Sequence, residues 1–139
     1  MINKLVVILG PTASGKTSFA VQLADKINSE IISADSRQIY KGMDIGTGKD
    51  LEEYIINNKT IPYHLIDILS PNEDYSVYQF RNDFFECYNR LKDKNRNIIL
   101  CGGTGLYIES VLLDYKIPNI QPNQKLRKFY ANMSTEDLV

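Results

Sequence analysis

Eight residues near the N-terminus, GPTASGKT, have the types and spacing of a phosphate-binding loop. In such a loop, backbone N–H groups and the start of the following helix surround an anion. We expect Lys16 to reach the outer phosphate and the Thr17 hydroxyl to ligate Mg²⁺. The motif therefore predicts a polyphosphate ligand and a magnesium cofactor, but not which polyphosphate. The predicted binding residues are Gly10, Pro11, Thr12, Ala13, Ser14, Gly15, Lys16 and Thr17.

A carboxylate and a hydroxyl follow two other apolar runs, EIISA and NIILCGG, at Asp35 and Thr104. Many P-loop enzymes carry a magnesium-binding acid after such a run, but NIILCGGT has no carboxylate, which argues against an ordinary ATPase. Because parallel strands share their carboxyl edge, we expect Asp35, Thr104 and the P-loop to converge. Asp35 then suits a general base. The structural alternatives are a turn cap for Asp35 and a hydroxyl bonded to backbone for Thr104.

Short apolar runs alternate with helical patterns along the chain. The runs at 4–10, 30–35 and 95–103 predict strands, the first buried on both faces, and YHLIDIL at 63–69 is a fourth candidate. Helices are predicted after the P-loop, from a capping box at Ser76 and Gln79, and over 106–114. Residues 37–62 predict a glycine-rich loop. We expect an α/β fold, with a P-loop NTPase-like parallel sheet flanked by helices. The predicted apolar stripes are Phe19, Ala20, Leu23, Ala24 and Ile27 in the first helix and Val77, Phe80, Phe84, Tyr88 and Leu91 in the second.

The C-terminal residues read as a new unit. Pro118 and Pro122 mark a linker, a helical pattern starts at Gln124, and Ser134 begins a cap for a further helix about one turn before the end. A helix of one turn has little stability alone. We therefore expect a truncated chain, with a catalytic core over 1–118 and the start of a helical insertion over 119–139.

Composition excludes several classes of function. The 139 residues are 43% hydrophobic and 24% charged, as in a globular domain, and the formal net charge of −1 does not itself indicate nucleic acid. Cys87 and Cys101 are predicted to be buried free thiols, and the only histidine, His64, to be structural. The residue pattern predicts neither a signal peptide nor a run long enough to span a membrane. We expect a cytoplasmic protein.

Five motifs, in order and at similar spacing, resemble those of the tRNA dimethylallyltransferases, the MiaA family: GPTASGKT, ISADSRQIYKGMDIGTGK, YHLIDI, YSVYQF and GGTGLYIE. The resemblance covers residues 4–127. It implies transfer of a dimethylallyl group from dimethylallyl diphosphate to N6 of the adenine 3′ of the anticodon in tRNA, with release of diphosphate. It also implies that residues 119–139 begin a tRNA-binding insertion. We expect a monomer that has no membrane partner.

The resemblance implies a role for individual residues. The P-loop would hold the donor's diphosphate, whose developing charge Lys16 and Mg²⁺ on Thr17 would stabilise. Asp35 matches the base that takes a proton from N6, and Thr104 matches a threonine bonded at the same centre. The implied catalytic residues are thus Asp35, Thr104 and Lys16. The implied tRNA contacts are Asp35, Ser36, Arg37, Gln38, Thr104 and Arg127.

Other readings stay open from sequence. Tyr40, Lys41, Lys49 and the turn at 46–48 are explained by loop structure as well as by RNA contact. An enzyme that prenylates free AMP would share the P-loop and Asp35. A small-molecule P-loop kinase would require a magnesium-binding acid that the sequence does not display at the expected strand end. An inactive fragment or separate binding module is the remaining alternative.

Overall fold

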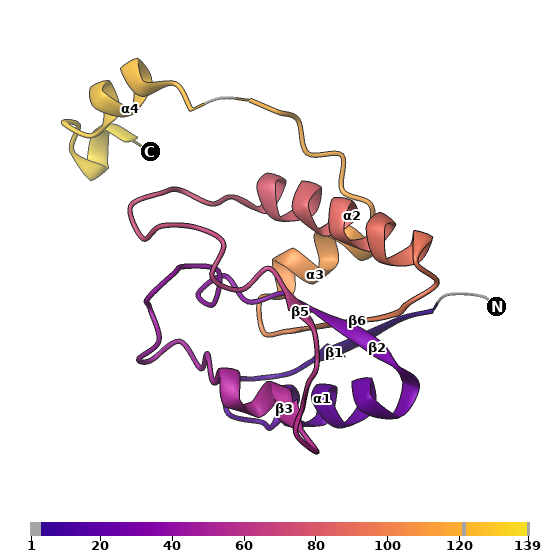
Figure 1. Cartoon of the computed structure of the whole chain (residues 1–139). Coiled ribbons are helices and arrows are strands. Elements are labelled where there is room, and N and C mark those ends of the chain that lie inside the picture. The colour runs from indigo at the N-terminus through magenta and orange to yellow at the C-terminus, as the bar shows by residue number, and fades with distance from the viewer. Residues whose placement is uncertain (1–3, 121, 139) are drawn as a thin grey trace.

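A four-stranded parallel sheet forms the centre of the protein (Figure 1). The computed structural model describes residues 4–120 and 122–138. The strands are β1 (Leu5–Leu9), β2 (Ser29–Ser33), β5 (Tyr63–His64) and β6 (Asn97–Gly102), in the sheet order β1-β6-β2-β5. All three pairings are parallel, so the predicted α/β architecture is confirmed.

Helices cover both faces of this sheet. α1 (Lys16–Ile27) packs on one face, and α2 (Val77–Asp93) and α3 (Gly105–Leu112) pack on the other (Figure 1). The central strand β6 is apolar after Asn97 because its alternate side chains enter both layers. Ile99 and Cys101 join the cluster under α1, whereas Ile98 and Leu100 join the cluster under α2 and α3.

Two burial predictions near the N-terminus are wrong. β1 is not buried on both faces: its residues are half-buried and Leu9 is exposed. The reason is that β6 inserts between β1 and β2, which leaves β1 at an edge of this sheet. In α1, Phe19 belongs to the predicted apolar stripe but is 59% exposed, because the helix turns Ala20, Val21 and Ala24 to the sheet instead.

The region between β2 and α2 contains more structure than the sequence indicates. A short 3₁₀ helix, η1 (Leu51–Tyr54), leads into a hairpin of β3 (Ile55–Ile56) and β4 (Lys59–Thr60). The predicted strand at 63–69 forms only as β5. It ends early because Leu65 and Asp67 take left-handed conformations, with φ of 61° and 55°, that no strand accommodates.

The predicted capping box of α2 is confirmed. The Gln79 N–H donates to Ser76 Oγ at 3.3 Å, and the Ser76 N–H donates to Gln79 Oε1 at 2.8 Å. Further along, α4 (Gln124–Tyr130) lies away from the sheet and buries none of its residues (Figure 1). The expected last helix is the 3₁₀ turn η2 (Thr135–Leu138). Within the described ranges, no helix has the length and apolar character needed to cross a membrane.

Candidate functional site

The P-loop joins the end of β1 to the start of α1, as its motif requires. Gly15 is the N-cap of α1 and has a φ of 77°, a conformation that glycine adopts without strain. No side chain caps the helix there, so the N–H groups of its first turn point into the loop. Lys16 Nζ donates to the Pro11 carbonyl across the loop, and Ser14 Oγ donates to the same carbonyl at 2.8 Å. These features fit the anion-binding loop predicted at this helix N-terminus.

The ends of β2 and β6 bring Asp35 and Thr104 together. The Ala34 N–H donates to the Cys101 carbonyl at 2.8 Å, and the Thr104 N–H donates to the Ala34 carbonyl at 3.1 Å. The strands approach so closely at this point that a Cβ on Gly102 would lie 2.8 Å from the Ala34 Cα. Only glycine fits there without movement of a backbone.

Side chains on the two strand ends continue this contact. The Ser36 N–H donates to Thr104 Oγ1 at 3.0 Å, and Thr104 Oγ1 donates to Ser36 Oγ at 3.3 Å. Asp35 Oδ1 accepts from the Arg37 N–H at 2.9 Å, while its second oxygen has no hydrogen bond in the described structure. The structural alternatives for these residues, a turn cap for Asp35 and a hydroxyl bonded to backbone for Thr104, are thus both present as hydrogen bonds. They position both side chains at the carboxyl edge of the sheet and leave a carboxylate oxygen of Asp35 available.

A cavity of about 310 Å³ opens at this edge. The P-loop forms one side of it, and Asp35 and Gln38 lie on another. The predicted convergence of Asp35 with the P-loop is therefore present in the structure. Thr104 is bonded to Ser36 but is not among the residues that line the cavity, and neither are Ser36 and Arg37. The lining residues are Thr12, Ala13, Ser14, Gly15, Lys16, Thr17, Asp35, Gln38, Thr47, Gly48, Asp50, Glu53, Tyr54, Cys101 and Gly102.

Three lining residues were missed by the sequence reasoning: Glu53 and Tyr54 in η1, and Asp50, its N-cap. The residue that could have indicated η1 in the sequence is Asp50. It caps η1, where its side chain accepts a hydrogen bond from the Glu52 N–H at 3.2 Å. Two of the three, Asp50 and Glu53, are carboxylates. The cavity therefore contains further acidic side chains even though no acid follows β6. Burial raises the pKa of Tyr54 and raises that of Cys101 to about 11, so both stay protonated near neutral pH.

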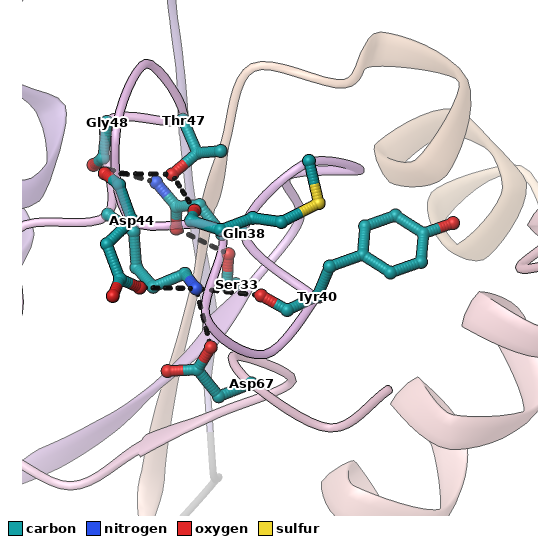
Figure 2. A network of polar contacts seen from close by, with 9 residues as sticks. Ser33, Gln38, Tyr40, Asp44, Thr47, Gly48 and Asp67 are labelled. Carbon is teal, nitrogen blue, oxygen red and sulfur yellow. Dashed lines mark hydrogen bonds and ion pairs between the residues drawn. The ribbon is translucent and has the colours of Figure 1, made fainter. Parts of the chain in front are cut away.

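The loop of residues 40–50 contributes Thr47, Gly48 and Asp50 to the lining of the cavity, and Figure 2 shows the polar contacts of this loop. Ser33 Oγ donates to Gln38 Oε1 at 3.2 Å, and Gln38 Nε2 donates to the Gly48 carbonyl at 3.0 Å, which ties the loop to β2. Lys49 is buried and bonded to Tyr40, Asp44 and Asp67. Burial acts to lower the pKa of Lys49, but its hydrogen bonds to Asp67 and Asp44 outweigh burial and the net pKa is raised. Lys49 is a charged internal group and not a surface contact for RNA.

Two other residues lie away from the cavity. Arg127 is on α4, whose side chains are exposed and which lies apart from the sheet (Figure 1). Its contact with tRNA stays a prediction. His64 lies on β5, where its Nε2 is 2.8 Å from Glu30 Oε2 and its Nδ1 is 3.5 Å from Arg90 Nη2. These contacts between β5, β2 and α2 favour the structural role predicted for His64.

Magnesium fits the chemistry of the cavity. Mg²⁺ prefers oxygen ligands and is commonly held by one or two protein oxygens together with substrate phosphates and water. Thr17 offers a hydroxyl at the start of α1, in a cavity that the carboxylates of Asp35, Asp50 and Glu53 also line. Among the residues that the structure describes, no cluster of three or more acidic, histidine or cysteine side chains has the geometry of a metal site. A metal at Thr17 would therefore depend on the oxygens of a bound polyphosphate.

The sequence matches a known family and several characterised relatives. The family model for IPP transferase matches residues 38–138. The chain is 58% identical over 134 residues to tRNA dimethylallyltransferase 2 of Bacteroides fragilis. The aligned region covers 96% of this chain and 44% of the relative. It is 56% identical over 135 residues to tRNA dimethylallyltransferase 1 of Azobacteroides pseudotrichonymphae, with coverage of 97% and 44%. The chain thus spans less than half the length of these relatives.

Solved structures give the same grouping. The full-length tRNA isopentenylpyrophosphate transferase of Bacillus halodurans aligns with a TM-score of 0.77 at 39% identity, over 98% of this chain and 45% of that one. A eukaryotic dimethylallyltransferase acting on tRNA aligns with a TM-score of 0.76 at 28% identity, over 94% of this chain and 33% of that one. These alignments show a shared fold, and the family model that matches residues 38–138 shows the family.

Proposed function

Because the chain belongs to the IPP transferase family, we propose that it is the N-terminal catalytic part of a tRNA dimethylallyltransferase. The full protein would transfer a dimethylallyl group from dimethylallyl diphosphate to N6 of the adenine 3′ of the anticodon. The observation that carries this proposal is the cavity shared by the P-loop and Asp35. A phosphate-binding loop next to a carboxylate suits an alkyl transfer in which diphosphate leaves and a nitrogen loses a proton.

In the proposed reaction, N6 of the adenine attacks C1 of the dimethylallyl group as the C1–oxygen bond breaks. The bonding electrons leave with diphosphate, whose negative charge the P-loop N–H groups and Lys16 stabilise. Asp35 accepts the proton that N6 loses. Thr104 supports this geometry through Ser36, the residue next to Asp35. Mg²⁺, held by Thr17 and the diphosphate, supplies further positive charge when it is bound.

The remaining assignments rest on the same proposal. Gln38 lines the cavity beside Asp35, and Ser36 and Arg37 flank it, which is compatible with contact to the target nucleotide. Arg127 and the rest of residues 119–139 would belong to a tRNA-binding region. We place the enzyme in the cytoplasm, where its tRNA substrate is available, and expect it to act as a monomer.

The decisive experiment uses the full-length protein with isotopically labelled dimethylallyl diphosphate and either unmodified tRNA or AMP. We expect label in tRNA, at the adenine 3′ of the anticodon, and none in AMP. Label in AMP alone would overturn the tRNA assignment in favour of the nucleotide-prenylating alternative. Label in neither, together with phosphate transfer from ATP to a small molecule, would favour a kinase and refute prenyl transfer.

A further inference from the structure

Lys49 is the best-buried charged group in the described structure, and it lies beside the cavity without lining it. Its side chain has 0% exposure. Its ammonium donates to the Tyr40 carbonyl at 2.8 Å, to Asp44 Oδ1 at 3.0 Å and to Asp67 Oδ1 at 2.5 Å. Figure 2 shows these three acceptors arranged around a single nitrogen. All three hydrogens of the ammonium are therefore used, and none is available to a ligand.

The three acceptors come from different parts of the chain. Tyr40 begins the loop, Asp44 lies near its tip, and Asp67 lies in the segment after β5. Asp67 has a left-handed backbone, with a φ of 55°, and its N–H donates to the Gln38 carbonyl at 3.1 Å. Lys49 thus connects both ends of the loop to the segment that follows the edge strand.

Little else holds this loop in place. Its tip is exposed: Ile45 is 99% exposed, and the Thr47 hydroxyl bonds to the Met43 carbonyl within the loop itself. Gly42, Gly46 and Gly48 all have positive φ, so the backbone is of a kind that is flexible when unconstrained. Besides Lys49, the described hydrogen bonds that attach the loop to the rest of the chain are the bond from Gln38 to Gly48, the bond from the Lys41 N–H to the Leu69 carbonyl, and the bonds that Asp50, at the end of the loop, accepts from the first turn of η1.

The residues on both sides of Lys49 line the cavity. Thr47 and Gly48 precede it and Asp50 follows it, and all three line the same cavity as Asp35 and the P-loop. We propose that Lys49 is a positioning residue, whose ammonium holds the 40–50 loop in place as part of the cavity wall. The loop then constrains the substrate group that reacts beside Asp35, whereas the P-loop alone holds the diphosphate. The activity assay of this inference rests on the proposed prenyl transfer. Its structural measurements, hydrogen exchange above all, do not depend on that proposal.

The test uses Lys49→Met in the full-length protein, at a temperature where circular dichroism shows that the variant is folded. Hydrogen exchange should accelerate in peptides covering residues 41–50 and stay unchanged in α2. Affinity for inorganic pyrophosphate should change by less than about threefold, because the P-loop comes from β1 and α1. Prenyl transfer should fall by about 10- to 100-fold in kcat/KM, as expected for misplaced reacting groups.

Two further variants keep the test decisive. Lys41→Met makes the same substitution at an exposed lysine of the same loop and should leave hydrogen exchange of residues 41–50 as in the wild type. Asp67→Asn keeps the side-chain shape, removes one charge, and should give a smaller effect of the same kind, about 3- to 10-fold. It replaces Lys49→Met if that variant does not fold.

The outcomes separate this inference from the proposed function. Wild-type kcat/KM and wild-type exchange in Lys49→Met, or in Asp67→Asn if Lys49→Met does not fold, would overturn the positioning role. So would an increase in exchange across the whole protein that matches the loss of activity, because that pattern describes a purely structural residue. Failure of the wild-type protein to transfer the prenyl group would refute the proposed function, while local exchange in residues 41–50 would still test the role of Lys49.

Discussion

Gly102→Ala is the substitution for which the structure makes the sharpest prediction. The added Cβ would lie 2.8 Å from the Ala34 Cα and closer still to the carbonyl group of Ala34. Two carbon atoms pack best at about 3.5–4.0 Å, so β2 and β6 must separate by about 1 Å at their carboxyl ends. All the atoms in this contact are backbone, so no side-chain rotation relieves it. We expect a loss of about 3 kcal/mol in the free energy of unfolding, at the upper end of the usual range for overpacking.

The same displacement should reduce activity more than stability alone explains. The Thr104 N–H donates to the Ala34 carbonyl, and Asp35 follows Ala34, so the shift moves the proposed base relative to Thr104. Misplacement of reacting groups by about 1 Å costs on the order of 100-fold in rate. Urea unfolding and kcat/KM for labelled dimethylallyl diphosphate, both in the full-length protein, measure the two effects.

Gly103→Ala is the matched control. A Cβ at Gly103 would have the Gly10 carbonyl oxygen at 3.5 Å as its nearest neighbour, which is ordinary van der Waals contact. We expect a change below about 0.5 kcal/mol in the free energy of unfolding, as for a substitution without a steric conflict. Equal destabilisation by the two substitutions would refute the argument that close approach of the strand ends, and not loss of glycine as such, controls this position.

Three further predictions concern the cavity. Asp35→Asn keeps an acceptor for the Arg37 N–H, so it should reduce prenyl transfer by about 10²- to 10⁴-fold while pyrophosphate binding persists; normal turnover would remove Asp35 from the mechanism. Lys16→Ala should weaken binding of dimethylallyl diphosphate by about tenfold or more in calorimetry, since a charged hydrogen bond is lost; unchanged affinity would contradict the phosphate assignment. The pKa of the Cys101 thiol is raised from 9.0 to about 11, so its contribution to stability is present below pH 9 and is lost as pH rises toward 11. The stability difference between wild type and Cys101→Ala should therefore shrink by about 1 kcal/mol between about pH 8 and about pH 10 in urea unfolding, and a constant difference would contradict burial of the neutral thiol.

Local chemistry determined much of this protein from sequence alone. The P-loop motif is contiguous, so the place of residues 10–17 between a strand and a helix was predictable without a fold; the phosphate ligand that its glycines, lysine and threonine indicate stays a prediction. The capping box of Ser76 and Gln79 spans one helical turn and was predictable for the same reason. The central strand β6 was recognisable as a strand from its short apolar run, but the equally apolar β1 is half-buried, so the pattern did not reveal which strand is covered on both faces.

Tertiary structure decided what depends on contacts between distant residues. The edge position of β1 follows from the insertion of β6, and sequence patterns do not specify strand order. The internal role of Lys49 requires Asp67, 18 residues away, and the pairing of Ser36 with Thr104 spans 68 residues. Lysine in a glycine-rich loop has the same local appearance whether it faces RNA or an internal carboxylate. Only the folded chain places Asp67 beneath it, and the free energy of burying its charge is then balanced by the ion pairs that form.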